Sequence, residues 1–143
     1  MCAGRWNWNA PKRPRRGSVD IKKVVLCDDD KTTTLIVKHL LTKIGFSVTT
    51  ANNGAEGLAR INTETPDLLI LDLDMPVKNG IAVLEELKAK SGPAPYIIVM
   101  SAHESPEDQK KVLGLGAREM VIKPFKPADL VEKIEGLVKE GKF

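Results

Sequence analysis

The stretch LLILDLDMPVKNG, residues 68–80, joins an uninterrupted apolar run to two carboxylates and a turn rich in proline, asparagine and glycine. An apolar run without polar alternation is typical of a strand that is buried on both faces of a parallel sheet. Asp72 and Asp74 follow where such a strand would end. The stretch therefore predicts a buried strand that delivers carboxylates to one edge of a sheet.

Four other short runs complete the set of expected strands. Three are as apolar as the first, and the fourth is half polar, which suits the edge of a sheet. They are VVLC (24–27), YIIVM (96–100), MVI (120–122) and SVTT (47–50).

The segments between these runs have helical periodicity and helix-end signals. In the first segment the apolar residues recur at the spacing of one helix face, and Gly45 is expected to end the helix. Asn53, Asn79 or Gly80, Ser105 followed by Pro106, and Pro127 are expected to begin the later helices. Strands and helices thus alternate five times, which predicts a doubly wound parallel sheet with helices on both faces. The apolar faces expected in the first and last helices are Val37, Leu40, Leu41 and Ile44, and Leu130, Ile134, Leu137 and Val138.

Length and composition fit one domain preceded by a basic arm. The chain has 143 residues and 42% hydrophobic residues, enough for a self-sufficient core. Residues 1–23 carry seven Lys and Arg and one Asp, whereas residues 24–143 carry fifteen Lys and Arg and eighteen Asp and Glu. We interpret residues 1–20 as a flexible arm and residues 21–143 as the folded domain.

Cysteine content and hydropathy exclude several classes of protein. Cys2 and Cys27 make no disulfide framework, and no Cys/His cluster has metal-binding spacing. No apolar run is long enough to span a membrane, and the first residues lack the apolar stretch of a signal peptide. These features favour a cytoplasmic protein. For the basic arm (PKRPRR, 11–16), we favour a solvated tail over contact with nucleic-acid phosphates or a nuclear localisation signal.

Polar residues follow every apolar strand run. Asp28, Asp29 and Asp30 come after VVLC, and Asp72 ends the strand that contains LLIL. Ser101 follows YIIVM, and Lys123 follows MVI. In doubly wound sheets, ligands bind outside the carboxyl ends of the strands. Because several carboxylates at one edge repel one another, the site needs a cation, and Mg²⁺ prefers such oxygen ligands. We expect a phosphoryl-transfer site with an attacking carboxylate, a metal, a lysine and a hydroxyl.

Four motifs together resemble the receiver domain of bacterial two-component response regulators, including the single-domain chemotaxis regulator. They are VVLCDDD, LDLDMPVKNG, VMSA and VIKPF, and the similarity extends from about residue 22 to the end of the chain. The resemblance implies a five-stranded flavodoxin-like sheet with strand order 2-1-3-4-5.

The resemblance also assigns roles to individual residues. It makes Asp72 the phosphoacceptor, Ser101 the switch hydroxyl and Lys123 the amine that pairs with the phosphoryl group, with a cis peptide before Pro124. The Mg²⁺ site would comprise Asp28, largely through water, with Asp29, Asp72 and the backbone carbonyl of Asp74. Asp30 lies outside this acidic pair, and we expect it to cap the first helix.

Three positions are expected to modulate the signal. Asp74 and His103, two residues past the acceptor and the switch hydroxyl, would flank the path of the hydrolytic water and set the phosphoryl lifetime. Met120 stands where the family carries an aromatic switch residue, so the side-chain part of the switch should be less sharply two-state. As a plain strand residue, Met120 would simply fill the core. His39 is expected on the polar side of its helix.

The resemblance implies a response regulator receiver rather than an enzyme that turns over a separate substrate, and we expect it to act as a stand-alone domain. A histidine kinase, a phosphotransfer protein or a small phosphodonor would phosphorylate Asp72. Output would go to a protein target through the face formed by the fourth helix, the fifth strand and the fifth helix. The domain would catalyse only its own phosphorylation and dephosphorylation.

Two alternatives are also compatible with the sequence. The DLDMP segment partly matches the nucleophile motif of haloacid-dehalogenase-like phosphatases, although the order of acidic motifs along the chain argues against that family. The chain is also compatible with a fragment of a longer regulator that has a DNA-binding or enzymatic output domain.

Overall fold

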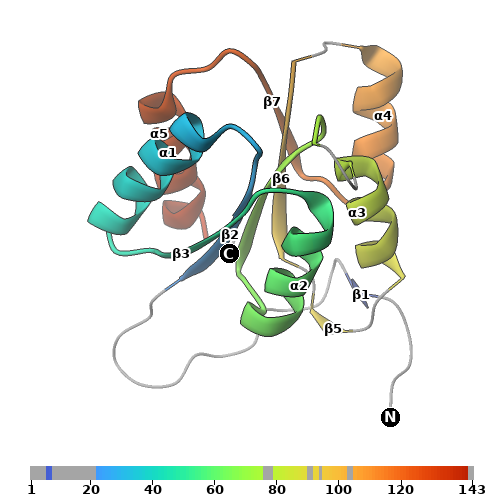
Figure 1. The fold of residues 1–143 in the computed structure, drawn as a ribbon, viewed down its shortest axis with the longest axis horizontal. Helices are drawn as coiled ribbons and strands as arrows, with labels where there is room; N and C mark the ends of the chain where they lie inside the picture. The colour runs from blue at the N-terminus through green and yellow to red at the C-terminus, as the bar shows by residue number, and fades with distance from the viewer. Residues whose placement is uncertain are drawn as a thin grey trace.

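A five-stranded parallel sheet runs through the centre of the computed structural model, with helices on both sides (Figure 1). The structure describes residues 6–7, 22–75, 79–89, 92–93, 95–102 and 105–141. The strand order is β3-β2-β4-β6-β7, which is 2-1-3-4-5 when the strands of this sheet are counted along the chain, as predicted. The strands are β2 (Lys23–Cys27), β3 (Ser47–Ala51), β4 (Leu68–Asp72), β6 (Tyr96–Ser101) and β7 (Glu119–Ile122).

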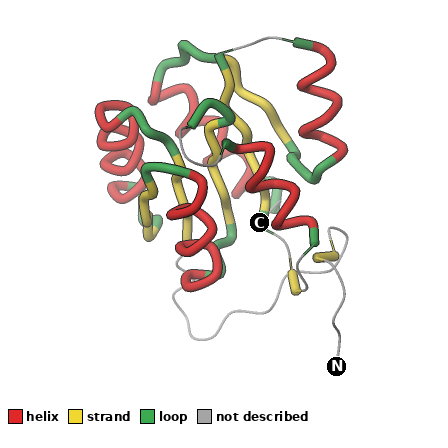
Figure 2. Tube along the Cα trace, turned by 45° about the vertical axis from the view of Figure 1, so that its right-hand side comes forward, coloured by secondary structure: helices red, strands yellow, loops and turns green. Residues whose placement is uncertain are grey.

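The helices form two layers that enclose the sheet. Helices α1 and α5 cover one face, and α2, α3 and α4 cover the other (Figures 1 and 2). Their bounds are α1 (Lys31–Lys43), α2 (Gly54–Glu64), α3 (Gly80–Lys88), α4 (Pro106–Gly114) and α5 (Pro127–Lys139).

The central strands are buried on both faces because alternate side chains point to opposite sides of a strand. Leu69 and Leu71 of β4 pack with the core residues of α2, α3 and α4. Leu68 and Ile70 of the same strand pack with those of α1 and α5. This arrangement explains the continuous apolar runs in the sequence. Strand β3 lies at the sheet edge, where three of its five residues are only half-buried, as its polar composition predicted.

The predicted helix starts are confirmed. The side chains of Asp30, Asn53, Asn79 and Ser105 each accept a backbone N–H from the first turn of the following helix. Each bond satisfies a donor that the helix itself cannot satisfy. Helix α5 begins at Pro127 without a side-chain cap.

The expected apolar face of α1 is wrong at one position. Val37 and Leu41 are buried, whereas Ile44 is 41% exposed. The helix ends before Ile44, which is its C-cap residue, and Gly45 continues the turn with a positive φ of 105°. The helical spacing therefore no longer applies at Ile44.

The predicted basic arm lies outside the described residues, apart from Trp6 and Asn7. These two residues form the short strand β1 (Trp6–Asn7), which pairs in parallel with β5 (Gly92–Pro93). The sequence does not predict this pair of strands, because two residues are too few to show a periodicity. Among the residues that the structure describes, no helix has the length and apolar character needed to cross a membrane.

Candidate functional site

The carboxyl ends of the parallel strands bring the predicted polar residues to one edge of the sheet. Asp28 directly follows β2, Asp72 is the last residue of β4, Ser101 is the last residue of β6, and Lys123 directly follows β7. The sheet register aligns these ends, since Asp72 lies opposite Met100 and Ser101 lies opposite Ile122.

Three carboxylates form a compact acidic group at this edge. One oxygen from each of Asp28, Asp29 and Asp72 lies within 4.8 Å of the others. Asp28 and Asp72 are buried and Asp29 is exposed, so the group opens to solvent on one side. The sequence predicted this convergence. Hard oxygen donors that crowd together in this way fit a divalent cation such as Mg²⁺.

Lys123 contributes a positive charge between the two buried carboxylates. Its Nζ lies 2.9 Å from Oδ2 of Asp72 and 3.3 Å from Oδ2 of Asp28. Burial lowers the pKa of Lys123, but the hydrogen bond to Asp72 and the charge of Asp28 outweigh that effect and raise it. Lys123 therefore stays protonated and offsets part of the negative charge. The peptide bond between Lys123 and Pro124 is cis, as predicted.

The surroundings of Asp28 disfavour its ionisation. Burial, followed by the neighbouring Asp72 carboxyl group, raises its pKa to about 6. The backbone N–H of Asp30, which donates to Oδ1 of Asp28 over 2.9 Å, and the charge of Lys123 act in the opposite direction. The negative charges of Asp28 and Asp72 therefore repel each other, and a bound cation would offset this repulsion.

We expect Asp28 to make the free energy of unfolding fall as the pH rises. Its folded-state pKa of about 6 exceeds the ordinary value of 3.8, so the folded chain binds more protons between these values and loses stability as pH rises through them. Asp28→Asn should remove this contribution and raise the free energy of unfolding near pH 7 by about 1–2 kcal/mol without Mg²⁺. Urea unfolding of both proteins across this pH range measures the difference, and parallel pH profiles would contradict it.

Asp74 is placed differently from the other carboxylates. Its backbone N–H donates to Oδ1 of Asp72 over 3.0 Å. Its side chain is directed to the end of the neighbouring strand, where Oδ2 accepts the backbone N–H of Ala102 over 3.3 Å. The sequence does not predict the contact between Asp74 and Ala102, because the direction of a side chain in a turn leaves no periodic pattern in the sequence.

The four remaining predicted residues, Ser101, Met120, His39 and His103, have different positions. Ser101 is buried at the edge, and its carbonyl accepts the backbone N–H of Lys123 over 2.8 Å. Met120 is half-buried and packs against the core of α2, α3 and α4, as expected for a strand residue that fills the core. His39 is exposed, as expected. His103 lies outside the described residues.

Gly80 fixes the start of α3 against the strand that carries Asp72. A Cβ atom at Gly80 would lie 2.7 Å from the carbonyl oxygen of Asp72 and 2.8 Å from Cα of Leu73. The Gly80 N–H also donates to the carbonyl of Leu73 over 3.2 Å. The missing side chain thus lets the helix approach the backbone of the site closely.

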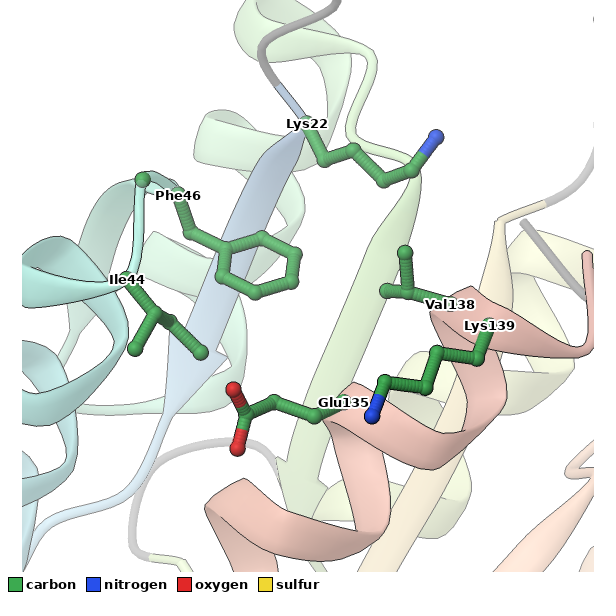
Figure 3. A pocket seen from close by; sticks show the side chains of 7 residues that line it. Lys22, Ile44, Phe46, Glu135, Val138 and Lys139 are labelled. Atoms are coloured by element: carbon green, nitrogen blue, oxygen red, sulfur yellow. The ribbon is translucent and has the colours of Figure 1, made fainter.

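A separate groove of about 260 Å³ lies at the opposite, amino-terminal end of the sheet. Figure 3 shows Ile44 and Phe46 facing three residues of α5 across it. Its lining is largely apolar with flanking charges of both signs, unlike the acidic edge. The lining residues are Lys22, Ile44, Gly45, Phe46, Glu135, Val138 and Lys139.

Known proteins match most of this chain in sequence. The sequence model of the response regulator receiver domain matches residues 24–135. Transcriptional regulatory protein PrrA of Mycobacterium leprae is 35% identical over 121 residues, which make up 85% of this chain and 52% of that protein. Transcriptional regulatory protein CpxR of Klebsiella pneumoniae is 38% identical over 121 residues, or 85% of this chain and 51% of that protein.

Solved structures of receiver domains also resemble this chain. A CheY-like response regulator receiver domain protein from Methanospirillum hungatei has a TM-score of 0.76 at 30% identity, with 86% of this chain and 98% of that chain covered. Chemotaxis protein CheY4 of Vibrio cholerae has a TM-score of 0.72 at 28% identity, with 81% and 98% covered. The chain spans about half the length of the curated relatives named above. With residues 24–135 matched, the chain belongs to the response regulator receiver domain family.

Proposed function

We propose that the chain is a phosphorylation-controlled signalling module in which Asp72 accepts the phosphoryl group. The observation that carries the proposal is the placement of Asp72, a buried carboxylate paired with Lys123 and grouped with two other carboxylates. A structural ion pair alone would need no additional acidic groups beside it. The grouping instead suits a reaction at Asp72 in which a bound cation and Lys123 offset the charge of an incoming phosphoryl group.

The reaction follows from the donors around Asp72. An oxygen of its carboxylate attacks the phosphorus of the donor, an O–P bond forms, and the bond from phosphorus to the leaving group breaks. Lys123, which pairs with Oδ2 of Asp72 before the reaction, then neutralises phosphoryl oxygens. The Ser101 hydroxyl, on the neighbouring strand end, donates a hydrogen bond to one of them.

Mg²⁺ is the cation that best suits this site. Asp28, Asp29, Asp72 and the backbone carbonyl of Asp74 would hold it, the first of them largely through water. When bound, Mg²⁺ supplies positive charge that offsets both the crowded carboxylates and the incoming phosphoryl group. Asp29, as the exposed member of the group, is the ligand most open to solvent exchange.

Partners follow from the family. A histidine kinase or a phosphotransfer protein would supply the phosphoryl group, and a small phosphodonor would replace it in vitro. Output would pass to a protein target through the face formed by α4, β7 and α5. On this face Glu119 accepts a hydrogen bond from the Tyr96 hydroxyl over 2.9 Å and pairs with Lys133 over 2.6 Å, so that β6, β7 and α5 are joined beside Met120.

A second candidate output is control of gene expression. The matched relatives PrrA and CpxR are transcriptional regulators, and the matched residues make up about half of each. The receiver would then govern a DNA-binding partner domain rather than a separate target protein. Both outputs use the same phosphorylation at Asp72.

Stoichiometry of labelling tests the proposed function. With Mg²⁺ and acetyl phosphate, we expect label to approach one phosphoryl group per chain, because the acyl phosphate forms on the protein itself. An aryl phosphate should show no sustained turnover. Continuous hydrolysis of the aryl phosphate without stable labelling would instead favour a phosphatase, the alternative that the DLDMP segment left open.

A further inference from the structure

Two consecutive hydrogen bonds connect Asp72 to the first residue after β6. The Asp74 N–H donates to Oδ1 of Asp72 over 3.0 Å, and the Ala102 N–H donates to Oδ2 of Asp74 over 3.3 Å. Asp74 and Ala102 are both exposed at this edge. The Asp74 side chain therefore bridges the carboxyl ends of two strands and holds the backbone N–H of Ala102.

The structure on either side of this bridge is fixed independently of Asp74. The Leu73 N–H donates to the carbonyl of Met100 over 2.9 Å, and the Lys123 N–H donates to the carbonyl of Ser101 over 2.8 Å. These bonds keep Ser101 in the sheet whether or not the bridge is present. Loss of the bridge would thus free the Ala102 N–H and leave the strand in place.

A phosphoryl group on Asp72 would compete for the same donor. It brings a charge of about −1.5 to −2 and oxygens that accept hydrogen bonds from backbone N–H groups. The Asp74 carboxylate already occupies the Ala102 N–H, and its negative charge repels an anion at Asp72. Because the bridge is exposed and its hydrogen bond is long, its contribution to stability is small enough for an anion to overcome.

We propose that the Asp74 carboxylate is a latch that holds the Ala102 backbone in its unphosphorylated position through the Ala102 N–H. Phosphorylation displaces the latch, and the freed Ala102 N–H turns to the phosphoryl oxygens while the start of α4 moves. The latch rests on the proposed phosphorylation of Asp72. It makes Asp74 a positioning residue that sets the balance between the two states, in addition to any effect on phosphoryl lifetime.

Two substitutions separate the parts of the latch. Asp74→Ala removes both the acceptor oxygen and the charge, whereas Asp74→Asn keeps an acceptor and removes the charge. Glu85→Ala is the matched control, because Glu85 is an exposed acidic residue on α3. Each protein is examined with beryllofluoride, which stands in for the phosphoryl group, at Mg²⁺ concentrations shown to saturate that protein.

Without beryllofluoride, Asp74→Ala should speed hydrogen exchange of the Ala102 amide and shift amide resonances at the start of α4 toward their bound positions. Its apparent affinity for beryllofluoride should rise about three- to tenfold, since no hydrogen bond must be displaced. Asp74→Asn should fall between Asp74→Ala and wild type, and Glu85→Ala should match wild type. A purely structural role would lower affinity instead.

The outcomes distinguish the latch from the function on which it rests. Wild-type protein that binds beryllofluoride, with unchanged Ala102 exchange and unchanged affinity in Asp74→Ala, would overturn the latch alone. Wild-type protein that binds no beryllofluoride in the presence of Mg²⁺ would overturn the proposed function and the latch together. Equal effects of Asp74→Ala and Glu85→Ala would also overturn the latch, because they would show a general charge effect.

Discussion

The Asp72→Asn variant is expected to take up no stable label from acetyl phosphate, with incorporation at least ~100-fold below wild type. An amide is a poor nucleophile toward phosphorus and forms no acyl phosphate. The amide oxygen can still accept the N–H of Asp74, and Lys123 keeps Asp28 as a partner, so the fold should survive. Mass spectrometry of the intact protein measures incorporation, and circular dichroism checks the fold.

Asp129→Asn is the matched control for this variant. Asp129 is an exposed aspartate in the first turn of α5, so the same change of carboxylate to amide there should leave labelling at the wild-type level. Undiminished labelling of Asp72→Asn at neutral pH would rule out Asp72 as the acceptor. Loss of labelling in both variants would point to a general effect of charge.

The second large effect is expected from Gly80→Ala. The new Cβ would meet the Asp72 carbonyl oxygen at 2.7 Å and Cα of Leu73 at 2.8 Å, and neither backbone atom can rotate away. Helix α3 must therefore shift from the end of β4, at a cost of about 1–3 kcal/mol in the free energy of unfolding. Because the shift displaces the backbone of Asp72, we also expect slower labelling by acetyl phosphate.

Gly136→Ala separates this clash from the general effect of adding a methyl group to a helix. A Cβ at Gly136, inside α5, would meet nothing within 4 Å. That substitution should stabilise the protein by up to about 1 kcal/mol, because alanine favours helix. Denaturant unfolding of both variants gives the comparison. If the two substitutions change stability equally, the close approach of α3 to the site is not the constraint described above.

The sheet was predictable because burial of parallel strands leaves a direct mark on the sequence. Strand β4 is apolar from Leu68 to Leu71 because both of its faces are covered, and no amphipathic pattern competes with that interpretation. Helix starts were predictable because capping residues have a recognisable side chain. Asn53, for example, accepts a backbone N–H from the first turn of α2. Ile44 was mispredicted because periodicity does not specify where a helix ends.

The composition of the site was predictable, but its internal contacts were not. Charged residues at the ends of buried strands, such as Asp72 and Lys123, are costly unless they meet, so the topology alone brings them together. The direction of the Asp74 side chain depends on turn geometry and on the neighbouring strand end. The closeness of Gly80 to the site depends on helix placement. Neither has a signature in local sequence.

The central claim is that the phosphoryl group resides on Asp72, and chemical mapping of the modified residue tests it most directly. Wild-type protein is labelled with acetyl phosphate and Mg²⁺ and then treated with borohydride, which reduces an aspartyl phosphate to homoserine. Peptide sequencing by mass spectrometry locates the converted residue. We expect homoserine at position 72, with Asp28, Asp29 and Asp74 unchanged. Conversion at any of those three residues with Asp72 intact would contradict it.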